Sequence, residues 1–229
     1  MADPSHLRDA YFQPDMDVPP AVSLVERALV CDTFERVGPD APTLAGAWKT
    51  HQLAAHLIVR ERSPLGSAMA AIPRFGDSEV ESLVGRGDFY GLVDALRSGP
   101  PRLSLFGWDA TDRNLNTLEF FIHHEDVLRA ATPSTPRQLP RWAEDQIWWR
   151  LKIFAKMTMR HSDVPVALQR CDDPHEPSST ASKGPHPVVV LGLPSELAMF
   201  SYGRGTVASV ELTGRAAAVE KLRAARFGL

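Results

Sequence analysis

The chain has 229 residues, of which 44% are hydrophobic and 23% are charged, a composition typical of a globular protein with a sizeable core. Its formal net charge of -3 at pH 7 gives no basic surplus for neutralising phosphates, so nucleic acid is not expected as a partner. The N-terminus lacks the features of a secretory signal, and no stretch approaches about 18 uninterrupted apolar residues, so we expect a cytoplasmic protein without a membrane span.

Two helices are predicted after a tail over residues 1–20. Residues 21–38 carry apolar side chains at helical spacing, and the pattern ends at Gly38. Residues 50–62 repeat the pattern, with Thr50 as the expected N-cap and with "SPLG" at residues 63–66 as the break.

Further helices are predicted over the next hundred residues. Residues 77–99 are interrupted by glycines and stopped by "GPP", which favours two short helices. After a linker, residues 113–131 form the longest apolar-periodic segment, and a tryptophan-rich helix starts at Pro140 and runs to residue 161. The sequence therefore predicts an all-α helical bundle over residues 21–160.

The composition changes after residue 160. β-branched residues become frequent, as is typical of strands, and a polar loop at residues 172–185 separates the first two of these segments. The order is strand, strand, helix with Ser195 as its expected cap, strand and closing helix, at residues 164–171, 186–194, 195–204, 206–214 and 215–227. We therefore predict a small α/β domain over residues 161–229 and an α+β fold class for the whole chain.

The segment "LEFFIHHEDVLRA" at residues 118–130 places titratable groups in an otherwise apolar helix. At about 100° per residue, a narrow arc of about 80° holds four polar side chains with apolar residues on both sides: Asn116, Glu119, His123 and Asp126. Glu125 and Arg129 form an i,i+4 pair on another side of the helix, which we expect to face solvent. His124 is expected to be a surface or supporting group. The narrow stripe is therefore predicted to point into the bundle.

A buried carboxylate is costly unless it is paired or bound to a metal, so Glu119 needs a partner. His123 lies four residues later, about 6 Å along the helix axis, where both side chains can reach one divalent ion. His56, which lies among apolar residues in "LAAHLIV", is the expected third ligand from a facing helix. Two imidazoles and one carboxylate with an open position suit a catalytic ion, with zinc first and nickel, iron or manganese as alternatives.

Three readings without a metal stay open at this point. A Glu and a His four residues apart are often a structural hydrogen-bonded pair, and a lone histidine such as His56 is often a core residue. The three side chains together could also form a dry polar network.

Two segments, "PTLAGAWKTHQLAAHLIVRER" and "LNTLEFFIHHEDVLRA", carry a resemblance to a known family. They look like the metal-binding domain of the mycothiol-dependent maleylpyruvate isomerase family, a branch of the DinB-like four-helix metalloproteins found in actinobacteria. The chain most resembles an uncharacterised actinobacterial subgroup with "GPDAPTL", "HHEDV" and a terminal "ELxxFxxGR" segment. The resemblance runs from about Leu24 onward and implies an up-down helical bundle followed by a small α/β domain.

The resemblance implies a ligand set and an activity. The family's metal ligands fall on His56, Glu119 and His123, and its members use the metal with mycothiol for cis-trans isomerisation or S-transfer. It therefore implies a small-molecule thiol and an electrophilic substrate as partners. Arg204 is the candidate catalytic cation that holds a substrate or thiol carboxylate; alternatively it only satisfies the last carbonyls of its helix. A non-catalytic protein that binds metal, thiol or another small molecule is the alternative function, and a monomer is compatible with the sequence.

Overall fold

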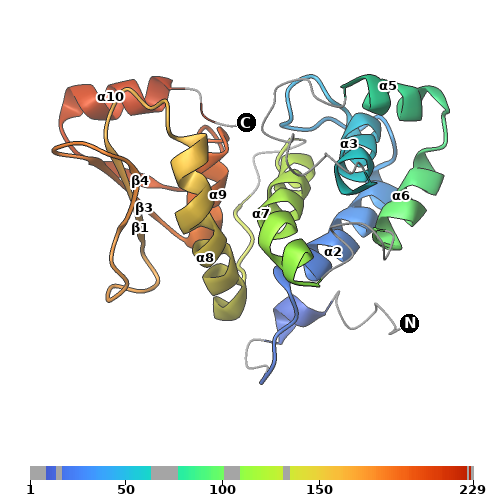
Figure 1. Cartoon of the computed structure of the whole chain (residues 1–229), viewed down its shortest axis with the longest axis horizontal. Coiled ribbons are helices and arrows are strands. Elements are labelled where there is room, and N and C mark those ends of the chain that lie inside the picture. Colours follow the sequence, from blue (N-terminus) through green and yellow to red (C-terminus); the bar gives the residue numbers. More distant parts are fainter. Residues whose placement is uncertain are drawn as a thin grey trace. The chain divides into compact units, whose positions relative to one another are not determined.

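The helical first part of the chain and its β-branched second part fold as separate units. The computed structural model describes residues 9–13, 17–62, 77–100, 109–130, 135–225 and 227, with the backbone alone at residues 77 and 109–115. The units are residues 1–134 and 135–229 (Figure 1). The predicted break at 63–66 and most of the predicted linker lie outside the described residues. Among the described residues, no helix is both long and apolar enough to cross a membrane.

The described part of the first unit is helical. Its elements are a short 3-10 helix η1 and five α-helices: η1 Ala10–Phe12, α2 Val22–Val37, α3 Thr50–Arg62, α5 Asp77–Gly85, α6 Phe89–Arg97 and α7 Asp109–Leu128. The helices predicted at 21–38 and 50–62 are confirmed, and so is the pair of short helices in 77–99. Helix α2 packs against α7 and α6, and α3 packs against α5 and α6.

The end of α2 and the start of α3 are fastened to each other. Gly38 closes α2 with φ +78°, a left-handed conformation that glycine adopts at low cost, and its N–H donates to the carbonyl of Phe34 at 2.9 Å. Thr50 is the first helical residue of α3, and its hydroxyl donates to the Gly38 carbonyl at 2.5 Å. The prediction of Thr50 as an N-cap is therefore wrong, because its side chain serves the preceding helix end instead.

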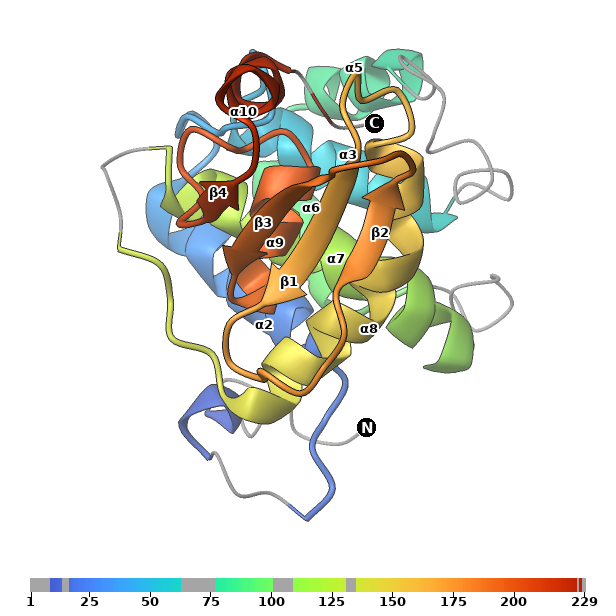
Figure 2. The same cartoon turned by 90° about the vertical axis from the view of Figure 1, so that its left-hand side faces the viewer.

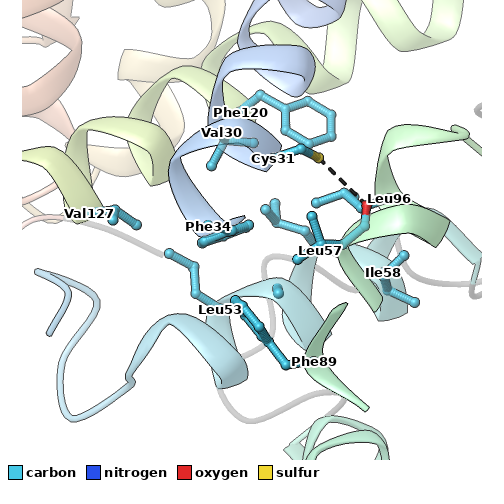
Figure 3. Close-up of a cluster of buried hydrophobic side chains, with 12 residues drawn as sticks. Val30, Cys31, Phe34, Leu53, Leu57, Ile58, Phe89, Leu96, Phe120 and Val127 are labelled. Carbon is cyan, nitrogen blue, oxygen red and sulfur yellow. Dashed lines mark hydrogen bonds between the residues drawn. The ribbon is translucent and has the colours of Figure 1, made fainter. Parts of the chain in front are cut away.

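The apolar core of the first unit is built from α2, α3, α6 and α7. Figure 3 shows the cluster, in which Phe34, Leu53, Leu57, Leu96 and Phe120 are at most 1% exposed. Cys31 lies in the same cluster and its thiol faces the carbonyl of Val93 at 3.8 Å. Burial raises the pKa of Cys31 to about 12, so this cysteine behaves as a small apolar residue.

The described part of the second unit is a four-stranded sheet with three helices. The strand order is β2-β1-β3-β4, with β1 Val166–Arg170 parallel to β3 Val188–Gly192, and with β2 Ser179–Ser182 and β4 Glu211–Thr213 antiparallel at the edges. Helices α8 Arg141–Thr158 and α9 Pro194–Ser201 lie behind the sheet in Figure 2, where α9 contacts β1 and β3 and α8 contacts β2. Helix α10 Ala216–Ala224 contacts β3. Strand β2 falls in the segment that the sequence predicts as a loop, and that detail of the prediction is wrong.

Helix α8 belongs to the second unit. The sequence predicts it as part of the bundle, with the boundary between the two domains at residue 160. It packs against α9 and β2, and the Trp148 indole N–H donates to Glu176 at 3.1 Å. Periodicity identifies this helix correctly but carries no information about which unit covers its apolar face.

A carboxylate of α8 takes the place of a cap at the start of α9. The predicted cap, Ser195, is already inside α9, and both its N–H and its hydroxyl donate to Glu144 at 2.8 Å. Glu144 and Ser195 are each 2% exposed. Burial outweighs these two hydrogen bonds and raises the pKa of Glu144 to about 7.

This shift predicts a pH-dependent stability for the chain. A carboxyl group with a raised pKa holds its proton more tightly in the folded state, so stability falls as the pH rises from the unfolded value towards 7. Relative to Glu144→Gln, the wild type should lose roughly 3 kcal/mol between pH 4.5 and 7.5. Urea denaturation of both proteins at several pH values measures this difference, in which other titrating groups cancel. Parallel pH profiles would contradict the prediction.

Candidate metal centre

Three side chains from two helices of the first unit converge on one point. Glu119 and His123 lie one turn apart on α7, and His56 comes from α3, which presents it between apolar neighbours. The Nε2 atoms of His56 and His123 each lie 3.2 Å from Oε1 of Glu119. One ligand atom from each of the three residues lies within 4.8 Å of the other two. The structure therefore brings together the three residues chosen from the sequence.

This donor set fits a divalent ion. Zinc bound tetrahedrally by nitrogen and oxygen ligands at about 2.0–2.2 Å keeps neighbouring ligand atoms about 3.4 Å apart, close to the two separations of 3.2 Å. The side chains of His56, Glu119 and His123 are 25%, 17% and 13% exposed. The group is therefore mostly enclosed but open to solvent on the side of His56, as an ion with an exchangeable position requires.

Neighbouring groups fix the orientation of both imidazoles. The Nδ1 of His123 lies 3.0 Å from Oδ2 of Asp126, which is fully buried, so the imidazole N–H donates to the carboxylate and leaves Nε2 directed at Glu119. Carboxylates in this position are common partners of metal-binding histidines. The ring of Trp48 lies 5.0 Å from that of His56 and packs beside it. Asp126, one of the four polar residues of the predicted arc, thus lies where it can orient His123.

The electrostatics of the group differ from one ligand to the next. Burial lowers the pKa of His56, which favours its neutral, ligand-competent form. Burial alone would raise the pKa of Glu119, but Arg60 and the two imidazoles hold it well below its usual range. Burial also favours neutral His123, but its bonds to Asp126 and Glu119 raise its pKa to about 9. Glu119 is therefore an anion, and a metal would have to displace a proton from His123.

Arg60 is a site residue that the sequence analysis missed. Its guanidinium Nε lies 3.3 Å from Oε1 of Glu119, and its side chain is only 8% exposed. The Nη1 group donates to Oδ1 of Asn116, one turn before Glu119 on α7. The sequence signal was weak because Arg60 stands in "VRER" at the end of α3, where arginine usually serves the helix terminus.

The side of α7 predicted to face water is buried. His124, Glu125 and Arg129 are 3%, 1% and 5% exposed, so the prediction that this side faces solvent is wrong. The reason is that α2 supplies polar partners: His124 Nδ1 lies 2.6 Å from Oε2 of Glu26, and its Nε2 lies 3.0 Å from Oγ1 of Thr33. Arg129 pairs with Glu125 inside the protein, as the i,i+4 spacing predicts.

Arg204 lies in the second unit, just beyond α9. Its Nη1 group donates to the carbonyl of Tyr202 at 2.5 Å, and its backbone N–H donates to the carbonyl of Met199 at 3.0 Å. These are the helix-end contacts that the sequence analysis gives as the alternative role. A contact between Arg204 and a substrate stays a prediction.

Comparison with solved structures finds the same fold elsewhere. One similar chain is the crystal structure of the mycothiol-dependent maleylpyruvate isomerase, with TM-score 0.53 and 16% identity over 93% of this chain and 96% of that one. Another is a mutant of that isomerase with one histidine replaced by alanine, with TM-score 0.52, 16% identity and coverage of 93% and 95%. Comparison of the sequence with protein-family models and with curated proteins gave no match. The predicted α+β, DinB-like fold class is confirmed, and at this identity the likeness concerns the fold alone.

Proposed function

We propose that this chain is a metal-dependent protein of the mycothiol-dependent isomerase or S-transferase type, which activates a low-molecular-weight thiol at His56, Glu119 and His123. The observation that carries the proposal is the convergence of these three side chains within 4.8 Å of one another. The fold supports the choice of thiol, because the similar structures are described as mycothiol-dependent. Zinc is the first choice of ion, with nickel, iron and manganese as alternatives.

The chemistry divides between the ion and the chain. A divalent ion held by these residues would supply Lewis acidity and so would lower the pKa of a thiol bound to it. Glu119 and His123 contribute two ligand atoms from one rigid helix, and Asp126 keeps His123 in the ligand-competent orientation. Trp48 offers an apolar surface beside His56, the most exposed of the three candidate ligands. In our proposal, Arg204 is the cation that holds the carboxylate of the thiol or substrate.

The two cysteines of the chain support a small-molecule thiol as the nucleophile. Cys31 is buried with its pKa raised to about 12, and burial and Asp172 raise the pKa of the exposed Cys171. Neither cysteine is therefore a thiolate at neutral pH, and the thiolate needed for attack on an electrophilic carbon would have to come from outside the chain.

Turnover tests the proposal directly. The zinc-loaded protein, incubated with mycothiol and a panel of electrophiles that includes maleylpyruvate, should consume thiol or isomerise the substrate. Glu119→Gln should reduce the rate by at least about 100-fold, since outer partners of metal ligands alone are worth about 10- to 100-fold. Glu125→Gln is the matched control, because Glu125 lies on the same helix and pairs with Arg129 instead. Tight mycothiol binding without turnover on the whole panel would instead favour a non-catalytic binding protein.

A further inference from the structure

We propose that Arg60 is a positioning residue for the candidate metal centre: held by Asn116, it fixes the carboxylate of Glu119 between the two imidazoles. This inference rests on the proposed function, because it concerns the same ion. Arg60 would act on the ion only through Glu119, so its role is to position that side chain. The expected consequence is that the geometry of Arg60, beyond its charge, contributes to metal affinity.

Three nitrogen atoms surround one oxygen of Glu119. Oε1 lies 3.2 Å from Nε2 of His56, 3.2 Å from Nε2 of His123 and 3.3 Å from Nε of Arg60. The two imidazoles are the other members of the candidate ligand set, so Arg60 is the neighbour of Oε1 that would remain beside it after an ion binds. A glutamate has three rotatable bonds, and a ligand that must be ordered on binding loses affinity. Arg60 thus limits the freedom of Glu119 before the ion arrives.

Arg60 is itself held on its far side. Its Nη1 group donates to Oδ1 of Asn116, and the Nδ2 group of Asn116 donates to Oε1 of Glu61 at 3.1 Å. Glu61 in turn accepts two bonds from Arg27, at 2.7 and 2.5 Å. Asn116 is fully buried, and Arg60, Glu61 and Arg27 are at most 8% exposed. The guanidinium thus contacts two residues of α7 that lie one turn apart, Asn116 and Glu119.

The fork geometry of arginine is needed for this arrangement. Nε lies within ion-pair distance of Oε1 of Glu119, without a hydrogen bond to it, while Nη1 donates to Asn116, so one planar group contacts two residues at once. A lysine at position 60 keeps the positive charge but offers a single flexible ammonium, which cannot reproduce both contacts. Arg60→Lys therefore separates geometry from charge. This separation matters because removing the charge would also remove its repulsion of a cation, an effect of opposite sign.

The test is a measurement of metal affinity. Zinc affinity is determined by competition with a chromophoric chelator for the wild type, Arg60→Lys and Asn116→Ala, with circular dichroism to verify the fold. We expect affinity to fall by about 10- to 100-fold in Arg60→Lys, the usual effect of losing an outer partner of a metal ligand. Asn116→Ala should fall in the same direction, because Arg60 remains but loses its anchor. Cobalt absorption spectra should change in band shape in both variants as Glu119 loosens.

Arg129→Lys is the matched control. It makes the same substitution in a buried arginine of the same unit, whose ion pair is with Glu125. Its zinc affinity should stay within about twofold of the wild type even if its stability falls. Zinc binding by the wild type together with unchanged affinity and cobalt spectra in Arg60→Lys and Asn116→Ala would overturn the inference and leave the proposed function standing. A wild type that binds none of zinc, nickel, iron and manganese would overturn both.

Discussion

Replacing His123 with alanine is expected to abolish stoichiometric metal binding while the helices persist. The wild type should carry close to one divalent ion per chain, and His123→Ala should lower the affinity by more than about 100-fold, because it removes a ligand rather than an outer partner. The fold should be weakened but retained, because breaking the buried contacts with Asp126 and Glu119 costs about 3–5 kcal/mol out of a usual total of about 5–15 kcal/mol. Mass spectrometry of freshly purified protein measures the metal, and circular dichroism measures the helices.

The neighbouring histidine provides the control. His124→Asn keeps a donor near the position of Nδ1, which faces Glu26, but loses the contact with Thr33. Its unfolding temperature should fall while its metal content stays at the wild-type level, whereas His123→Ala should lose the metal. If both variants keep their metal, the ion lies elsewhere or the three side chains form a dry network.

The candidate ligand set could be found from the sequence because it leaves a local signature. Glu119 and His123 share one helix at a fixed spacing, so their proximity follows from helix geometry alone. His56 required a weaker argument, the cost of an imidazole among apolar neighbours, and the structure places it 3.2 Å from Glu119. Asp126 was found as a member of the same polar arc of α7.

The surroundings of the site could not be found in that way. The charges of Glu125 and Arg129 predict a side of α7 that faces solvent, but both residues are buried. Helix α2 already carried the contrary signal, because Glu26 and Arg27 lie within its apolar pattern and need buried partners. Which partners they find depends on the packing of helices that are distant in sequence, and periodicity within one helix does not report it.

The fold shows the same division between local and distant information. The apolar spacing at 50–62 predicts the bounds of α3, although Thr50 is its first residue and not its cap. Strand β2, at Ser179–Ser182, has little apolar character and is an edge strand held by pairing with β1, so its own sequence resembles a loop. The unit to which α8 belongs likewise depends on which distant elements cover it, here α9 and β2.

Removing one partner of the buried ion pair between Arg27 and Glu61 should strongly lower the free energy of unfolding. Glu61 is 2% exposed and accepts two hydrogen bonds from Arg27, which is 5% exposed. Glu61→Ala removes both of these hydrogen bonds from the buried cation, which also contacts the carbonyl of Leu96 and the ring of Phe120. Breaking such a pair costs about 3–5 kcal/mol. Urea denaturation should show a loss of that size.

A double variant separates the cost of breaking the pair from the net value of the pair. Arg27→Met with Glu61→Leu removes both charges together, so stability should return to within about 1–2 kcal/mol of the wild type or exceed it. Zinc affinity should nevertheless fall in the double variant, because Asn116 loses the carboxylate that holds its Nδ2 group and Arg60 loses a fixed anchor. A loss below about 1 kcal/mol in Glu61→Ala would contradict the burial of the pair. Restored stability together with weakened metal binding would show that this ion pair is kept for the geometry of Glu119 rather than for folding.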